Sequence, residues 1–370
     1  MSEISEGIAG TIGPDAQALL ARAAGAEARG RRALRAAIDD AFLAPETRLD
    51  DRARVALIGL IDALVTAIGQ DVRDHAARVL EGRGEAELAE ALTAGVHALG
   101  ERLEGAGVLR DPELVGECLA RIRCELIAAA LPAEAPADPD TPSLVVRLTG
   151  STDPVVAEAA TAVLAGESQR RAIAEGGAVS ASGLPPTLHR RLAWWVAAAL
   201  REAAAAATGD TPSVLDRAVI EAALRNIAAN ERQDRLEAAA MRLAEAIDAQ
   251  ADELPTLFDE ALRDRRVSLM IAFLAHALGI DYEMAREIVL DPTGERLWLS
   301  LRALELPRPA IARVGYRLCE ADGRRDLDGF ADMLDVVAGL DPRTARRAIA
   351  PLTLHPEFRT ALAALGGGRP

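Results

Sequence analysis

Seven residues spaced alternately three and four apart restrict the fold of this sequence more than any other feature. They lie between Asp50 and Leu80 and are Ile58, Ile61, Val65, Ile68, Val72, His75 and Val79. This spacing is that of a heptad seam, the contact stripe of left-handed helical bundles and coiled coils. We therefore expect one long helix over residues 50–80, packed lengthwise against other helices or against a second copy of the chain.

The rest of the sequence also has the periodicity of helices. Half of its residues are hydrophobic but only 3% are aromatic, so aliphatic side chains must fill the cores. Runs of alternating β-branched residues do not occur, and Gly or Pro falls mostly between periodic stretches. We predict an all-α fold, in which an amino-terminal antiparallel helical bundle is followed by a larger multi-helix array.

A chain of 370 residues is too long for one ordinary hydrophobic core. The segment PAEAPADPDTP, rich in Pro, Asp and Ala, has no apolar periodicity and is the best candidate for a linker. The predicted organisation is a bundle domain over 1–131, a linker over 132–142, a multi-helix domain over 143–365 and a disordered tail over 366–370. A short helix at 143–148 and a longer one beginning at Asp153-Pro154, with Val155 among its buried residues, resemble one HEAT-type unit.

Charge restricts the classes of partner. The chain has 42 basic and 57 acidic residues, a net charge of −15, and all of its basic residues are arginine. Such a charge disfavours nonspecific binding to nucleic acid or to anionic lipid. Without lysine the chain also lacks the phosphate-binding lysine of P-loop proteins and kinases and the amine of Schiff-base enzymes. We expect neither a nucleic-acid nor a membrane partner.

The amino-terminal twelve residues lack the basic and apolar regions of a secretory signal. The longest apolar stretches, such as Leu57–Val65 and Leu192–Leu200, are too short or too interrupted to predict a membrane span. Three cysteines, an odd and small number, indicate reduced thiols. These features predict a cytoplasmic protein.

Two segments carry a resemblance to a known family. One is the Leu184-Pro185-Pro186 turn with the following LHRRL and Trp194-Trp195-Val196 segments, and the other is the run from Phe273 to Leu306, which includes LDPTG. On these motifs the chain resembles the bacterial, mainly alphaproteobacterial, domain-of-unknown-function family 2336 from about Arg54 to about Leu340. The resemblance implies a cytoplasmic, all-helical protein with a regulatory or scaffolding role, and it carries over no catalytic residue.

His75 is the candidate with the most specific chemistry. A histidine on a long bundle helix is the phosphoryl acceptor of phosphotransfer hairpins, and Asp71 or Asp74 would orient its second ring nitrogen. In those hairpins the acid usually follows the histidine, whereas alanines follow His75. A histidine packed at the end of the seam is the alternative interpretation, and it is the one that the seam favours.

Trp194 is the candidate anchor of an interface. Leu188, Leu192 and Trp195 share one helical stripe, which places Trp194 outside that stripe, near Arg190 and Arg201. An exposed indole is typical of interface hot spots, although it could also pack on a neighbouring domain.

Two arginine pairs, Arg31 with Arg35 and Arg343 with Arg347, stand one helical turn apart. That spacing could clamp a phosphate or a cyclic dinucleotide, but it is also that of a solvated helix face, which is the interpretation that we favour in a chain without lysine. The sequence shows no local motif of a metal site or a nucleophilic enzyme. Cys118 and Cys124 point to different faces of one helix, so we expect buried thiols and no metal or cofactor.

These observations favour a non-enzymatic helical adaptor or regulatory protein that mediates protein–protein interaction in signalling. We expect a homodimer through the 50–80 helix, with Ile58, Ile61, Val65, Ile68 and Val72, together with Trp194, as interface candidates. The alternatives are a histidine phosphotransfer protein using His75 and a sensor of phosphate ligands or cyclic dinucleotides.

Overall fold

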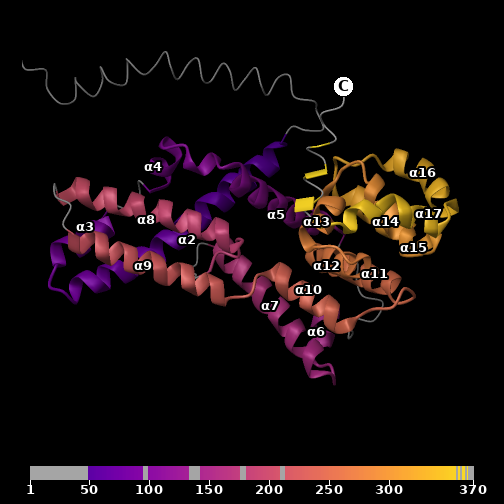
Figure 1. Cartoon of the computed structure of the whole chain (residues 1–370), viewed down its shortest axis with the longest axis horizontal. Helices are drawn as coiled ribbons and strands as arrows, with labels where there is room; N and C mark the ends of the chain where they lie inside the picture. Colours follow the sequence, from indigo (N-terminus) through magenta and orange to yellow (C-terminus); the bar gives the residue numbers. More distant parts are fainter. Residues whose placement is uncertain are drawn as a thin grey trace, which may run out of the picture. The chain divides into compact units, whose positions relative to one another are not determined.

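The structure is a computed structural model. It describes residues 49–94, 99–132, 142–175, 181–208, 213–355, 357–358, 361–362 and 365. Every regular element in these ranges is an α-helix or a short 3-10 helix, and none is a strand (Figure 1). The prediction of an all-α fold is therefore confirmed. The helices expected before residue 49 and the predicted tail at 366–370 lie outside the described residues.

The helices follow one another with short connections. Those before the predicted linker are α2 (Asp51–Glu81), α3 (Ala86–Ala94), α4 (Leu99–Gly105), η3 (Val108–Arg110) and α5 (Pro112–Ala130). The next are α6 (Leu144–Thr149), α7 (Pro154–Ala174), α8 (Pro186–Thr208), α9 (Ser213–Arg232), α10 (Leu236–Ile247) and α11 (Leu254–Arg263). The last are α12 (Val267–Leu278), α13 (Tyr282–Leu290), α14 (Glu295–Ala303), α15 (Arg308–Ala321), α16 (Leu327–Gly339), α17 (Pro342–Ile349) and η4 (Ala350–Thr353).

The long helix α2 packs against α3, α5, α8 and α9 of the same chain. Val65, Ile68 and Val72 of the predicted seam are buried there, but Ile58 is 63% exposed. The amino end of the seam is therefore not part of the core of this chain. A 3.5-residue period drifts around a straight α-helix by about 20° per heptad, so a heptad stripe leaves the buried face within a few turns. The buried face at this end is formed instead by leucines such as Leu57 and Leu60.

A second group of helices surrounds α10. This helix packs on α7 at one side and on α12 at another, and it contributes several alanines to the core. A Cβ atom at Gly166 of α7 would lie only 3.2 Å from the Cα and Cβ atoms of Leu236, which shows how closely the two helices approach. The continuous core extends from the end of α5 through α6 and α7 to α16.

The pair α6 and α7 pack together as the HEAT-like prediction requires. The Asp153 side chain accepts a hydrogen bond from the Val155 N–H at 2.8 Å and caps α7. Val155 itself is exposed, so its predicted burial is wrong, because the first turn of α7 projects beyond the helices that cover Val156 and Ala159.

Residues Asp51–Pro370 form one compact unit, separate from Met1–Asp50. Within it α2, from before the predicted linker, lies against α8 and α9 from after it, and α5 lies against α12 and α15. The two halves of the described chain thus share extensive helix contacts. Residues 133–141 of the linker lie outside the described residues, and its role as a domain boundary stays a prediction.

Among the residues that the structure describes, one helix has the length and hydropathy of a membrane span. It is α2, and 44% of its most apolar 18-residue window is buried inside the protein. The bent pair α12 and α13 passes the same criterion only if the two helices are taken together. The expectation that no apolar stretch is long enough is therefore wrong for α2. In the structure its apolar side chains meet those of neighbouring helices, as in the core helices of globular proteins.

Three aromatic rings close the carboxy-terminal end of the core. The Phe330 ring lies 4.5 Å from that of Trp298 and 5.4 Å from that of Tyr316, the latter edge-on. Gly315 of α15 allows this arrangement, because a Cβ atom there would lie 2.0 Å from the Cζ atom of Phe330. Gly116 of α5 is also inside a helix, but a Cβ atom there meets nothing within 4 Å.

These two glycines form a matched test of the packing. Gly315→Ala should lower the free energy of unfolding by about 1–3 kcal/mol, because the Phe330 ring must move. Gly116→Ala should raise it by about 0.5–1 kcal/mol through helix propensity alone. Urea unfolding followed by circular dichroism measures both changes, and equal effects of the two substitutions would contradict the packing around Phe330.

Candidate functional site

The clearest candidate site lies on the outer face of the hairpin formed by α8 and α9. Trp194 of α8 is 36% exposed, and Ile220 and Leu224 of α9 are 47% and 52% exposed. Trp194 and Ile220 line the same cavity of about 400 Å³. Leu224 is one helical turn from Ile220, so the three side chains share one face. We call Trp194, Ile220 and Leu224 the hairpin surface.

Ion pairs between the two helices stand at both ends of the hairpin surface. At one end the Arg201 Nε atom donates to Asp216 Oδ1 at 3.0 Å, and at the other end Arg190 pairs with Glu231. These pairs show that α8 and α9 run antiparallel, which brings Trp194 opposite the part of α9 that carries Leu224. The resulting pattern is an apolar centre within a polar rim, the usual anatomy of a protein–protein interface.

The inner face of the hairpin explains why Trp194 is outside. Leu188 and Leu192 of the predicted stripe are buried, and Trp195 is partly buried. The same face of α8 packs against α2, so a second indole has no room there. The placement of Trp194 outside the main stripe is confirmed. Its expected neighbour Arg201 lines the same cavity, although Arg201 pairs with Asp216 and Glu202.

The interface candidates of α2 do not form one continuous surface. Val65, Ile68 and Val72 are buried within the chain. Ile58 and Ile61, together with the edge of Val65, line a groove of about 740 Å³ between α2 and the α4–η3 segment. Only the amino-terminal end of the predicted seam is therefore accessible to another molecule.

His75 is partly buried where α2 meets α9. Burial, and then the charges of Arg225 and Arg78, lower its pKa below the usual value. Of the two carboxylates expected to orient it, Asp71 accepts hydrogen bonds from Arg225 at 3.3 Å and from Asn226 at 2.8 Å, and Asp74 accepts one from Arg73 at 3.2 Å. The phosphoacceptor role of His75 thus lacks the orienting contact that the sequence predicted.

The arginine pairs predicted for a phosphate ligand fall in different places. Arg343 and Arg347 are both exposed on α17, and their guanidinium groups have no partner among the residues that the structure describes. Arg31 and Arg35 lie outside the described residues. The expected burial of Cys118 and Cys124 is confirmed, and burial raises the pKa of each thiol to about 12. Both thiols are therefore protonated and unreactive at neutral pH.

In the described ranges, no three side chains of His, Cys, Asp or Glu come together in a way that could hold a metal ion. A serine and a histidine do meet, however, in a contact that the sequence did not reveal. Ser182 Oγ lies 2.8 Å from Nδ1 of His189, and both residues are buried. The spacing of seven residues between Ser182 and His189 resembles no catalytic motif. The only sequence signal for the burial of His189 was its position directly after a core leucine on α8.

The Ser182–His189 contact anchors a connection and does not face a substrate. The Ser182 N–H donates to Asn230 Oδ1 at 3.1 Å, and its hydroxyl accepts from the Leu184 N–H at 3.1 Å. Ser182 and His189 are at most 2% exposed, so no substrate can reach the hydroxyl. The cluster instead holds residues 181–185 against α8 and α9 at the foot of the hairpin.

His189 makes stability depend on pH. Burial lowers its pKa from 6.5 to about 4, although Asn226 opposes this shift. Because the pKa of His189 is lower in the folded protein, neutral His189 contributes its full share of stability above pH 6.5. This stability is lost as the pH falls toward the pKa of the folded state. Between pH 7 and pH 5 the loss should be about 2 kcal/mol. His189→Gln should remove this pH dependence of the free energy of unfolding. His276→Gln should retain it, because the imidazole that this substitution removes lies at the surface.

Urea unfolding at both pH values measures the difference. If the wild type and His189→Gln lose the same stability between pH 7 and pH 5, His189 does not carry the effect.

The comparisons with known proteins place the chain in a family. A family model described as "Uncharacterised protein conserved in bacteria (DUF2336)" matches residues 133–350, which hold the helices from α6 to α17. The match begins later than the expected resemblance from about Arg54, so α2 to α5 lie outside it. No curated protein and no solved structure matches the chain. The chain belongs to this uncharacterised bacterial family.

Proposed function

We propose that this protein is a non-enzymatic helical adaptor that binds a protein partner through the hairpin surface. The observation that carries the proposal is the exposure of Trp194 beside Ile220 and Leu224, between two ion pairs that hold α8 against α9. The hairpin surface lies within the part of the chain that matches the family.

The energetics of interfaces support this choice. A tryptophan at the centre of an apolar patch contributes more to binding than most residues, provided that surrounding groups exclude water. Arg201 and Asp216 stand beside Trp194 at the rim of the cavity. They already pair with each other across the hairpin, so a partner meets a surface whose charges are compensated. A partner with a complementary apolar side chain could fill the cavity of about 400 Å³ beside the indole.

The reactive groups of the described chain support a binding role over a catalytic one. The cysteines are buried with raised pKa values, and the Ser182–His189 contact is closed to solvent. Reduced, buried thiols also fit action in the cytoplasm, which we propose as the compartment.

Capture of partners from a lysate of the source bacterium tests the hairpin surface. Trp194→Ala and Leu224→Asp should each weaken retention of the same partner by at least about thirty-fold, since loss of a hot-spot residue costs about 2 kcal/mol or more. Val155→Asp is the matched control, because Val155 is an exposed apolar residue of α7, at 63%, that does not belong to the hairpin surface. Loss of the partner with the control variant, or retention with both hairpin variants, would refute the proposal.

We propose further that the adaptor forms a homodimer through the amino-terminal end of α2. Val55 and Ile58 are 70% and 63% exposed one turn apart, and Ile58 continues into the groove lined by Ile61. These positions can meet a second copy without opening the core, unlike Ile68 or Val72.

Light scattering at micromolar concentration measures the oligomeric state. The wild type should have the mass of a dimer, and Ile58→Asp should have that of a monomer, because a buried carboxylate at the interface has no partner. Val155→Asp should remain dimeric. A monomeric wild type would show that α2 does not mediate self-association.

A further inference from the structure

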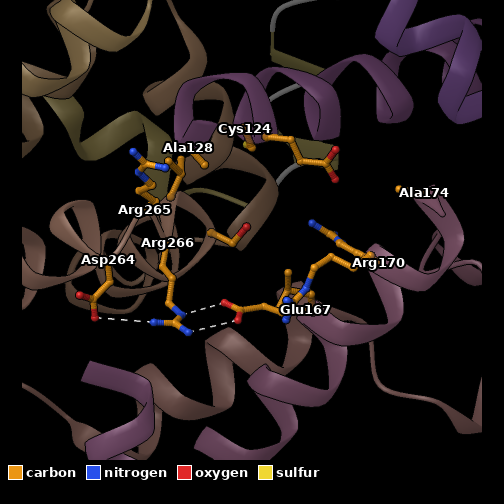
Figure 2. Close-up of a pocket in the computed structure, with 13 residues that line it drawn as sticks. Cys124, Ala128, Glu167, Arg170, Ala174, Asp264, Arg265 and Arg266 are labelled. Carbon is orange, nitrogen blue, oxygen red and sulfur yellow. Dashed lines mark hydrogen bonds and ion pairs between the residues drawn. The ribbon is translucent and has the colours of Figure 1, made fainter. Parts of the chain in front are cut away.

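A second cavity, unrelated to the hairpin surface, is lined by arginines. It has a volume of about 670 Å³ and lies between α5, α7 and the turn that joins α11 to α12. Figure 2 shows Arg170 on one side of it and Arg265 and Arg266 on the other. Arg171 of α7 is the fourth arginine, and the apolar side chains of Leu236 and Val267 also contribute to the wall. We call this cavity the arginine pocket.

Two of the four arginines are already bound to carboxylates. Arg266 holds both oxygens of Glu167, at 2.8 and 3.3 Å, and approaches Asp264 at 3.6 Å, as the dashed lines in Figure 2 show. Arg170 pairs with the buried Glu237 of α10. Such paired guanidiniums fix the positions of the walls and carry little uncompensated charge.

The other two arginines are not compensated. Arg171 and Arg265 are exposed, and neither guanidinium forms an ion pair or a hydrogen bond with any residue in the described ranges. The chain as a whole has a net charge of −15, so carboxylates are abundant on it. The three carboxylates that line the pocket are already engaged, Glu125 by Arg121 at 3.0 Å and Glu167 and Asp264 by Arg266. The two unpaired arginines at this concave surface therefore form a local site for an anion.

Arg265 occupies a backbone position that favours glycine. Its φ angle is +58°, at the end of α11. Its N–H donates to the Leu262 carbonyl at 3.0 Å, and the next N–H donates to the Ala261 carbonyl at 2.7 Å. This is the helix-ending turn in which glycine is the usual residue, since a side chain in this conformation is strained. An arginine side chain is therefore present at the pocket, although glycine at this backbone position would make the protein more stable.

From these observations we propose that the arginine pocket binds the phosphate group of a small organic phosphate, with Arg171 and Arg265 as its charged ligands. A phosphate carries close to two negative charges at neutral pH, which matches two uncompensated guanidiniums, and its oxygens accept the forked hydrogen bonds of arginine. A single carboxylate would leave one guanidinium uncompensated. Leu236 and Val267 supply apolar surface for the organic part of the ligand.

Calorimetry on the full chain at constant ionic strength tests the pocket, with inorganic phosphate and adenosine 5′-monophosphate as probes. Both should bind, and the nucleotide should bind more tightly because its organic part reaches the apolar wall. Arg171→Ala and Arg265→Gly should each lower the affinity about ten-fold, since one charged hydrogen-bonding partner is lost. The double variant Arg217→Ala/Arg308→Ala is the control, because it removes two exposed arginines that do not line the pocket.

Two results would overturn the proposal. One is the absence of binding of either probe at about 10 mM, the weak limit of specific recognition. The other is an equal loss of affinity in the control variant, which would show a general effect of charge. If inorganic phosphate binds as tightly as the nucleotide, the proposal that the apolar wall contacts an organic group of the ligand is refuted.

Arg265→Gly has a second readout that separates binding from structure. Because glycine relieves the strain of a positive φ, this variant should melt roughly 2 °C higher than the wild type while it binds the probes more weakly. A lower melting temperature together with weaker binding would indicate a purely structural role for Arg265.

Discussion

Close approach of helices through small aliphatic side chains is the constraint on which this structure depends. With few aromatic residues the core cannot be filled by large rings, so the helices must lie near one another. The contact of α7 with α10 is the clearest case, since Gly166 faces the backbone of Leu236. Arginine–carboxylate pairs then join neighbouring helices at the edges of these contacts, as Arg286 does with Glu117 at 2.6 Å between α13 and α5.

Local signals in the sequence were enough to predict the helices. Every regular element among the described residues is helical, as the periodicity predicted, and local caps set where helices begin: Asp281 caps α13 at 2.6 Å from the Met284 nitrogen. Which face of a helix is buried depends on how many neighbours surround it. The heptad stripe of α2 assumed contact along one seam, whereas α2 contacts at least six of the described helices, and Ile58 lies outside the core that they form.

The candidate site was predictable only in part, for a similar reason. The stripe of α8 was sufficient to place Trp194 outside the core, but Ile220 and Leu224 come from another helix, and their proximity depends on the antiparallel pairing of α8 with α9. The contact of Ser182 with His189 likewise requires a turn that no local pattern encodes. Arg171 and Arg265 are 94 positions apart by their numbering, and they line one cavity only because α7 and the turn after α11 lie on its two sides.

The position of α2 has a consequence for the family as a whole. The matched region starts at residue 133, yet α8 and α9 within it bury one apolar face against α2, which precedes it. A polypeptide reduced to the matched region would leave Val196 of α8 without its neighbour Gly69 of α2, and Asn226 of α9 without its hydrogen bond to Asp71. Any member that lacks a helix equivalent to α2 must shield these positions by another means, such as a different preceding segment, a subunit contact or more polar side chains.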